Sequence, residues 1–278
     1  MRVVVAGLGL MGSAYAERLA EKGFNVSLWS HRRGAAEELA KRIGASIASD
    51  EDLRSADVVI VAGWDDDYLL EIARRAADGT SVLVNAETVT PRASIEAGRI
   101  VGRRRYVEAP VAAGPGVARK GKLPVIVAYW DREAWEKAKP VVEVLAATII
   151  EAGEPPSAMV VKLAFNNILF TAVAGVAQSI GLLSAWGVDI DILKRLMEST
   201  WMKVIVERYW ERGLRGVETH FRIEGAAKDL MYAVEAAYER GRSLPVSYSA
   251  YTLYTECARR LGGRVDYTRV MECEYRGE

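Results

Sequence analysis

The stretch Gly7-Leu8-Gly9-Leu10-Met11-Gly12 decides the fold of the first half of the chain. It follows the β-branched run Arg2-Val3-Val4-Val5-Ala6 and leads into a helical pattern over residues 12–22. In such a turn the first glycine permits a tight bend, the second lets a pyrophosphate approach the backbone, and the third lets the helix pack against the strand. The free N–H groups at the helix start favour phosphate. The stretch therefore predicts a dinucleotide site built from all six residues.

Short β-branched runs alternate with amphipathic helical patterns after this turn. The predicted strands are residues 2–6, 25–29, 46–48, 58–62, 81–84 and 105–108, and the helices between them are 12–22, 35–43, 68–77 and 91–101. Strand–helix alternation implies right-handed crossovers and a parallel sheet covered on both faces. Residues 123–128, 132–145 and 147–151 are expected to extend the sheet at its edge.

The pattern changes at Glu154-Pro155-Pro156. Only helical periodicity follows, over residues 157–186, 190–198, 202–212, 223–240 and 246–261. A shift from α/β to all-α at a Pro-Pro pair predicts a domain boundary, with an α/β domain over 1–153 and an all-α domain over 154–278.

Composition narrows the range of functions. The chain has 278 residues, with 37 Lys+Arg against 37 Asp+Glu, and 50% of its residues are apolar. Non-specific binding to nucleic acids or anionic membranes depends on an excess of positive charge, so a net charge of zero argues against both kinds of partner. The 2 His and 2 Cys are widely scattered, so no metal site is expected. Two cysteines favour a reducing, cytoplasmic location, although one bridge between Cys257 and Cys273 remains possible. A single Gln and four Asn favour a heat-adapted source.

The segment 163–186 is apolar and long enough to cross a bilayer, which takes about 20 residues. It carries Asn166, Asn167 and Gln178, however, and a lone membrane helix should not hold three amides without partners. We therefore interpret it as a helix buried all round in a soluble protein.

The strand that follows the glycine turn bears on the cofactor. An NAD site usually has Asp or Glu at the end of this strand, to bind the ribose hydroxyls. This strand ends Leu28-Trp29-Ser30-His31-Arg32-Arg33, without an acid. A guanidinium can bind a 2′-phosphate through charge-assisted hydrogen bonds, and Ser30 can add a hydroxyl. NADP is therefore favoured over NAD, with Arg32 ahead of Arg33 and with His31 packing on the adenine or facing solvent.

Two loops follow strands of the predicted sheet, where ligands bind in such folds. Residues 85–91, which include Thr88, follow one strand, and residues 108–115 follow another. We expect both loops to border the cofactor cleft, and Gly63 and Trp64 are added as candidates for binding the cofactor.

Lys162 and Asn166 lie four residues apart and share one face of the long helix. Burying a charged amine is costly, so an apolar setting favours a lysine that can take up a proton as a general base. On spacing alone, a lysine whose stem is buried and whose amine reaches solvent fits equally well.

With these motifs in order, the chain resembles the β-hydroxyacid dehydrogenase family, which includes 3-hydroxyisobutyrate dehydrogenase, tartronate semialdehyde reductase and glyoxylate/succinic semialdehyde reductase. The resemblance covers nearly the whole chain. It is carried by the glycine stretch, the loop from Thr88 to Pro91, Ala109-Pro110-Val111 leading to Gly114, Lys162 with Asn166, and Phe221 followed by Lys228-Asp229-Leu230.

The resemblance implies an α/β Rossmann-type N-terminal domain and an all-α C-terminal domain linked by a long helix, here residues 157–186. It also implies dimers or tetramers that form through the helical domain. Lys162 would be the catalytic lysine and Asn166 would hold the substrate. Thr88 would lie by the nicotinamide, and Lys228 would contact the cofactor. The loop Ala112-Ala113-Gly114 would bind the substrate carboxylate, largely through backbone N–H groups. Trp201 and Phe221 are added as candidates for the substrate pocket.

Two departures affect the substrate. Relatives usually carry Asp-x-Ser-Thr where this chain has Asn85-Ala86-Glu87-Thr88, and Ser-Gly-Gly where it has Ala112-Ala113-Gly114. The hypothesis is a dehydrogenase for a short 3-hydroxy acid, such as L-serine or 3-hydroxyisobutyrate. An aldehyde or imine reductase is one alternative, although imine reductases usually replace the lysine. A non-catalytic NADP-binding sensor or scaffold is the other. No basic patch points to nucleic acid.

Overall fold

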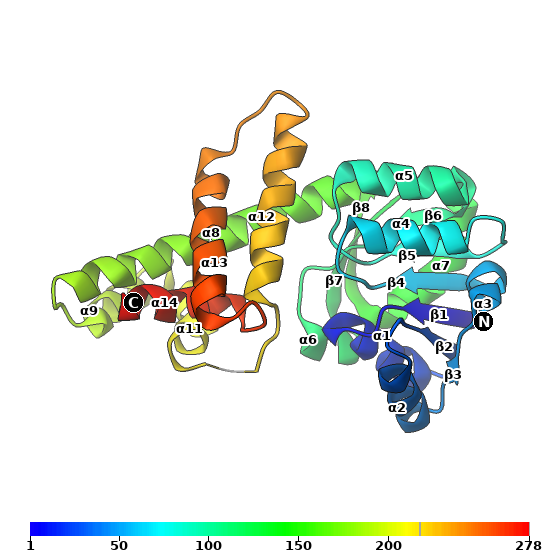
Figure 1. The fold of residues 1–278 in the computed structure, drawn as a ribbon, viewed down its shortest axis with the longest axis horizontal. Coiled ribbons are helices and arrows are strands. Elements are labelled where there is room, and N and C mark those ends of the chain that lie inside the picture. The colour runs from blue at the N-terminus through cyan, green and yellow to red at the C-terminus, as the bar shows by residue number, and fades with distance from the viewer. Residues whose placement is uncertain (217, 278) are drawn as a thin grey trace. The chain divides into compact units, whose positions relative to one another are not determined.

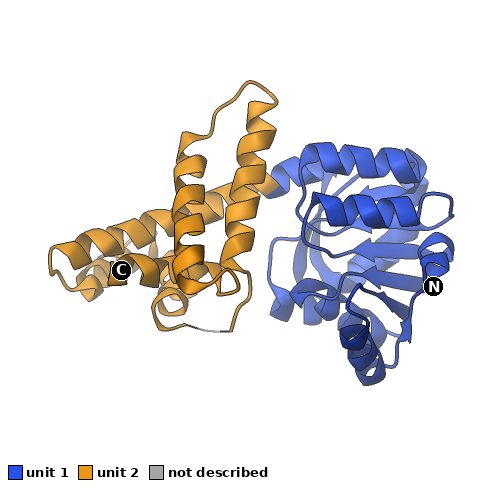
Figure 2. Cartoon of the chain, viewed as in Figure 1, with its two compact units in different colours: residues 1–162 blue, residues 163–278 orange. Residues whose placement is uncertain are grey.

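A computed structural model describes residues 1–216 and 218–277. The chain divides into two compact units, Met1–Lys162 and Leu163–Glu278, which are coloured separately in Figure 2.

The first unit is built on one eight-stranded sheet in the order β3-β2-β1-β4-β5-β6-β7-β8 (Figure 1). All neighbouring strands are parallel except β6 and β7, which are antiparallel. Strands β1 and β4 are fully buried apart from the first residue of β1, as expected of strands covered on both faces. The strands are β1 Arg2–Ala6, β2 Asn25–Trp29, β3 Ser46–Ile47, β4 Val58–Val61, β5 Val82–Asn85, β6 Tyr106–Glu108, β7 Leu123–Tyr129 and β8 Ala146–Gly153.

Helices cover both faces of this sheet. Val3 and Val5 of β1 belong to one hydrophobic core with residues of α1, α2 and α7, whereas Val4 and Ala6 belong to another with residues of α3, α4 and α5. Because alternate side chains of β1 point to opposite faces of the sheet, this one strand contributes to both hydrophobic cores. The helices are α1 Leu10–Glu21, α2 Arg33–Ile43, α3 Asp50–Ser55, α4 Asp66–Arg75, α5 Pro91–Val101, α6 Pro115–Arg119 and α7 Arg132–Leu145.

The predicted strands and helices of this half are confirmed, with boundaries that move by at most two residues, and the sheet is an α/β doubly wound one. The short helices α3 and α6 were not predicted. Helix α3 begins with a capping box, in which Ser49 and Asp52 each accept a hydrogen bond from the other's backbone N–H. The signature Ser-x-x-Asp was visible in the sequence, but six residues are too few to show helical periodicity.

The long apolar helix is α8, Ser157–Ala185. Among the described residues it is the one helix long and apolar enough to cross a membrane by length and composition, and 28% of its most apolar stretch is buried. The expectation that it is buried all round is wrong for the single chain, because Ile168 and Leu182 are 70% and 62% exposed. The apolar sequence of α8 indicates that its surface is buried from water, but it does not show whether the same chain or another molecule covers that surface.

The second unit is helical. Its described residues form no strand, only a single bridge between Arg222 and Asp266. Helices α12 and α13 run side by side and pack closely (Figure 1). The predicted helix over 202–212 is instead α10, a π-helical turn Val206–Trp210 and the start of α11, while α14 was not predicted. The helices are α9 Ile190–Glu198, α10 Lys203–Ile205, α11 Glu211–Arg215, α12 Ile223–Tyr238, α13 Pro245–Leu261 and α14 Val270–Arg276.

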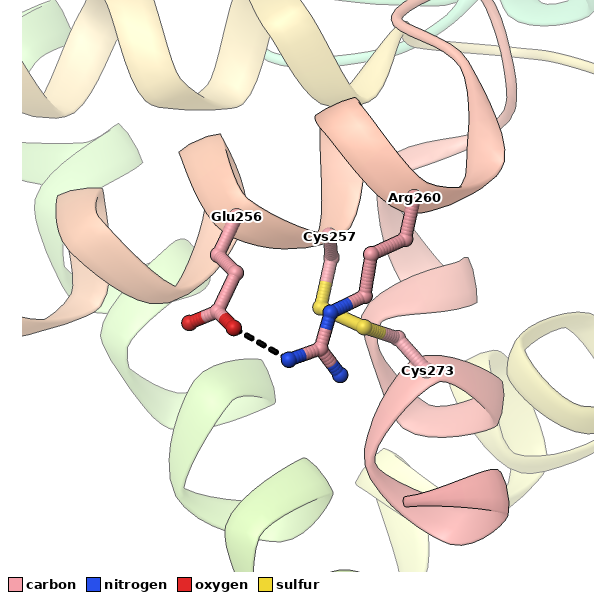
Figure 3. Close-up of a disulfide and its surroundings, with 4 residues drawn as sticks. All are labelled: Glu256, Cys257, Arg260 and Cys273. Atoms are coloured by element: carbon pink, nitrogen blue, oxygen red, sulfur yellow. Dashed lines mark hydrogen bonds and ion pairs between the residues drawn. A yellow bond between two sulfur atoms is a disulfide. The ribbon is translucent and has the colours of Figure 1, made fainter. Parts of the chain in front are cut away.

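A disulfide joins Cys257 of α13 to Cys273 of α14 (Figure 3). The sequence left this pairing open. Both cysteines are buried, with exposed fractions of 1% and 3%. Beside the bridge, Arg260 forms an ion pair with Glu256 on the surface of α13. The bridge therefore holds the last helix of the chain on the helical core.

Loss of this bridge should destabilise the second unit. The two cysteines are 16 residues apart, and a bridge that closes a loop of this size stabilises a fold by about 3 kcal/mol through the entropy of the unfolded chain. Reductant should therefore lower the urea midpoint of this unit, followed by circular dichroism. A Cys257→Ala/Cys273→Ala variant should show the lowered midpoint with or without reductant. An unchanged midpoint in reduced wild-type protein would contradict the expectation.

Candidate active site

The glycine turn joins β1 to α1 as a tight bend. Gly7 has a φ of +99°, and a Cβ there would lie 2.4 Å from the carbonyl oxygen of Ala62. A Cβ on Gly12 would lie 1.8 Å from the carbonyl oxygen of Gly7. At Gly9, in contrast, a Cβ would have no heavy atom within 4 Å. The backbone is thus tightly packed at Gly7 and Gly12, where a side chain would clash, whereas Gly9 faces open space that a ligand could occupy.

The start of α1 fits a dinucleotide pyrophosphate. Its N-cap is Gly9, which offers no capping side chain, and its first turn holds no acidic residue. Gly9 and Leu10 are exposed, and Leu8 and Met11 flank them in the same turn. Backbone N–H groups and the positive end of the helix dipole are therefore available to an anion, as a phosphate-binding turn requires.

The end of β2 brings Arg32 to this turn. The Arg32 backbone N–H donates to Ser30 Oγ at 3.1 Å, and its guanidinium donates to the carbonyl oxygen of Leu8 at 3.5 Å. Arg33 pairs instead with Glu37 on the surface of α2, at 3.1 Å. Of the two arginines, Arg32 is the one that the fold places beside the glycine turn.

His31 lies in a cluster of aromatic and charged side chains. Its Nε2 is 2.9 Å from Glu71 Oε2, and its ring lies edge-on to Trp29 and Tyr68. The imidazole thus has a protein partner on α4. The expected role on the adenine stays a prediction.

Two further loops expected at the cofactor follow β4 and β5. A Cβ on Gly63 would lie 1.9 Å from the Tyr68 ring, so only glycine lets that ring cover the backbone here. Trp64 is 38% exposed. Thr88 is half-buried in the loop after β5, where Glu87 is buried and donates its backbone N–H to Asn85 Oδ1 at 3.1 Å.

The loop proposed to bind a carboxylate has fewer backbone donors than expected. The Ala112 N–H donates to the carbonyl oxygen of Pro124 at 3.0 Å, so it is committed to β7. Ala113 and Gly114 are half-buried, and Gly114 is the N-cap of α6. The N–H groups of Ala113 and Gly114 therefore remain the candidates in this loop.

Lys162 lies at the end of the first unit, on the second turn of α8. Its exposed fraction is 8%, so the residue is buried. The interpretation as a lysine that reaches solvent does not fit this burial.

Asn166 and Lys228 meet on one carboxylate in the second unit. Asn166 Nδ2 donates to Asp229 Oδ2 at 2.6 Å, and Lys228 Nζ is 2.8 Å from Asp229 Oδ1. Lys228 also lies 4.3 Å from the centre of the Tyr232 ring. Asp229, which is 1% exposed, links two predicted site residues, yet it was not predicted as one itself. Of the three acids of α12, Glu224, Asp229 and Glu235, only Asp229 is buried, and the sequence alone does not show that difference.

The two aromatic candidates lie in different settings. Trp201 is 78% exposed in the single chain. Phe221 stacks on Phe170 at 5.6 Å between ring centres, within the core of the second unit. Their proposed contacts with a substrate stay predictions.

Among the described residues, one group of His, Cys, Asp or Glu side chains lies close enough together to hold a metal ion. Cys257, Cys273 and Glu274 offer ligand atoms within 4.8 Å of one another. The two sulfur atoms of that cluster are bonded to each other in the disulfide.

Two family models match this chain, one for each part. Residues 2–153 match the NAD-binding domain of 6-phosphogluconate dehydrogenase. Residues 157–273 match the NAD-binding region of NADP-dependent 3-hydroxyisobutyrate dehydrogenase. Together the two matches span almost the whole chain.

Known proteins resemble the chain over most of its length. An NAD-dependent L-serine dehydrogenase of Pseudomonas aeruginosa is 29% identical, over 91% of each chain. A 2-hydroxy-3-oxopropionate reductase of Escherichia coli is 25% identical, over 98% of this chain and 96% of the other. The solved 3-hydroxyisobutyrate dehydrogenase of Mycobacterium tuberculosis, with L-serine, superposes with a TM-score of 0.86 at 20% identity, over 98% of both chains. The last comparison shows the fold alone.

Proposed function

Because this chain belongs to the β-hydroxyacid dehydrogenase family of NAD(P)-dependent oxidoreductases, we propose that it oxidises a short 3-hydroxy acid with NADP. The candidate substrates are of the L-serine or 3-hydroxyisobutyrate type. The observation that carries the proposal is the burial of Lys162 on α8, followed four residues later by buried Asn166.

Lys162 is the proposed general acid/base. Neutral Lys162 takes the proton of the 3-hydroxyl group. A bound nicotinamide would supply the redox chemistry, as the acceptor of the hydride from the same carbon. In the reverse direction, the Lys162 ammonium returns the proton to the carbonyl oxygen. One amine thus supplies both proton transfer and charge stabilisation.

The other site residues orient the reactants in this proposal. Asn166 binds the hydroxyl group, and its amide is held in place by the hydrogen bond to Asp229. The N–H groups of Ala113 and Gly114 bind the substrate carboxylate. Arg32 and Ser30 bind the 2′-phosphate of NADP, while the glycine turn binds its pyrophosphate. Thr88 lies by the nicotinamide, with Gly63, Trp64, His31 and Lys228 as further cofactor contacts.

An assay with defined substrates tests this proposal. L-Serine and 3-hydroxyisobutyrate, each with NADP and with NAD, should give turnover seen as absorbance of the reduced cofactor, faster with NADP. Turnover only with glyoxylate or succinic semialdehyde would instead support the aldehyde reductase, which uses the same residues. Binding of NADP without turnover of any hydroxy acid, aldehyde or imine would support the sensor.

We also propose that the chain forms a homodimer or homotetramer through its helical unit, in the cytoplasm. Large apolar side chains of this unit are exposed in the single chain, which is typical of a surface that another protein covers. They include Ile168, Leu182, Trp186, Leu196, Trp201 and Val246. A disulfide in a cytoplasmic protein is rare outside hyperthermophiles, so the bridge agrees with the amide-poor composition.

A further inference from the structure

A chain of buried hydrogen bonds runs through the first unit. Asn85 Nδ2 donates to the Tyr106 hydroxyl at 3.2 Å, and that hydroxyl is 2.7 Å from Ser94 Oγ. Ser94 in turn donates to Glu108 Oε1. All four side chains are 0% exposed. The chain therefore connects β5, β6 and α5 without the participation of solvent.

Both ends of this hydrogen-bond chain lie beside residues of the proposed site. At one end, Asn85 Oδ1 accepts the backbone N–H of Glu87, which precedes Thr88. At the other end, Glu108 Oε2 accepts the backbone N–H groups of Ala158 and Met159, at 3.0 and 3.4 Å. These N–H groups belong to the first turn of α8, which has no carbonyl partner for them inside the helix. Glu108 thus holds the helix start one turn before Lys162.

The donors along this chain all point towards Glu108. Because Ser94 gives its proton to Glu108, the Tyr106 hydroxyl must donate to Ser94, and Tyr106 accepts from the Asn85 amide. A proton on Glu108 Oε1 would reverse the first two bonds. The Tyr106 proton would then face the Asn85 amide, which is itself a donor. An ionised Glu108 therefore gives every donor along this chain an acceptor.

We propose that Glu108 is a positioning residue, whose ionised carboxylate fixes the first turn of α8, and with it Lys162, relative to the Thr88 loop. The inference rests on the proposed function, because it assigns the catalytic proton transfer to Lys162. A negative charge at a helix N-terminus is favoured by the dipole, which adds to the two hydrogen bonds.

Burial opposes this ionisation. It raises the pKa of Glu108 to about 7, against the opposing effects of the Ser94 hydroxyl and of the Ala158 and Met159 N–H groups. The other groups that face this network are Tyr106 on the same strand and Asn85 on β5, with Glu87 acting on Tyr106. Loss of this charge as the pH falls below about 7 should weaken the hold of Glu108 on the first turn of α8.

The dependence of kcat on pH, measured for reduction of the carbonyl compound by NADPH, separates the role of Glu108 from that of Lys162. As the proton donor, Lys162 works in its charged form and loses activity only as the pH rises. A fall in kcat below about pH 7 is therefore expected from Glu108 alone. Glu108→Gln, which mimics the protonated acid, should lower the plateau of kcat by about 10-fold and abolish that fall, with the KM for NADPH within about 2-fold. A retained fall would overturn the proposal.

Tyr106 offers a second variant with a matched control. Tyr106→Phe removes the hydroxyl that links Ser94 to Asn85. Tyr15→Phe removes a hydroxyl from another fully buried tyrosine of the same unit, one whose oxygen has no hydrogen-bond partner among the described residues. Tyr106→Phe should lower kcat by about 5- to 10-fold, and Tyr15→Phe should leave it unchanged. Equal effects of the two would contradict a role of this hydrogen-bond chain.

Hydrogen exchange tests the helix contact without any substrate. Glu108→Leu removes the acceptor, so amides in residues 157–162 should exchange at least about 10-fold faster than in wild-type protein. Tyr15→Phe should show wild-type exchange there. Unchanged exchange in folded Glu108→Leu would overturn the proposal. Faster exchange, together with a wild-type protein that turns over no hydroxy acid or aldehyde, would leave the contact supported and reject the proposed function instead.

Discussion

Replacement of Lys162 by Met is expected to lower kcat by about 10²- to 10⁴-fold, the range that a positioned acid–base group contributes. Met keeps the unbranched shape of the side chain but carries no proton. Lys162 is 8% exposed, so an apolar replacement suits its surroundings and the variant should fold. Steady-state kinetics in both directions measure the loss. Titration with NADPH, followed by fluorescence, should show that cofactor binding is intact.

A lysine on the surface of the same unit provides the control. Lys139→Met removes an exposed amine, which lies 4.0 Å from Glu143 on α7, and should leave kcat unchanged. Circular dichroism should show that both variants are folded. If folded Lys162→Met protein keeps wild-type turnover, Lys162 is not the acid–base residue and the mechanism proposed above is wrong.

Replacement of Arg32 by Ala should lower kcat/KM for NADP by about 10- to 100-fold, because hydrogen bonds to charged groups contribute about 1.5–3 kcal/mol. The value for NAD should change little, since NAD carries no 2′-phosphate. The guanidinium of Arg32 reaches the carbonyl oxygen of Leu8 in the glycine turn, beside which the ribose of a bound cofactor is expected. Kinetics with both cofactors at saturating substrate give the ratio.

Arg33 is a matched control for this experiment, since it has the same charge and is adjacent in sequence. It forms an exposed ion pair with Glu37, so Arg33→Ala should leave the NADP-to-NAD ratio almost unchanged. Equal losses in the two variants would indicate a general effect of charge near the cofactor. A wild-type preference for NAD would reject the assignment of Arg32 altogether.

The strands and the glycine turn of the first unit could be predicted because their signals are local. A β-branched run such as Val58–Val61 shows its burial directly, and the spacing of Gly7, Gly9 and Gly12 fixes a turn of known shape. The surface of α8 could not be predicted in the same way. Its apolar residues are alike in sequence, while their exposure differs from Val173 at 0% to Ile168 at 70%.

The polar partners of the site could not be predicted, because they come together only through the fold. Asp229 lies 63 residues from Asn166, and Glu108 lies 50 residues from Ala158. No periodicity or motif relates such positions, and the energetic reason for each pair is the cost of leaving a buried polar group without a partner. Lys162 and Asn166, in contrast, share one helix, so their spacing was informative.

The carboxylate of Asp229 also constrains how this protein can be redesigned. Because Asn166 and Lys228 both bind it, a change at either one alters the charge and geometry that the other experiences. Substitutions at these positions should therefore be non-additive, and a library that varies them one at a time will miss productive combinations. Directed evolution towards a new substrate should randomise residues 166, 228 and 229 together.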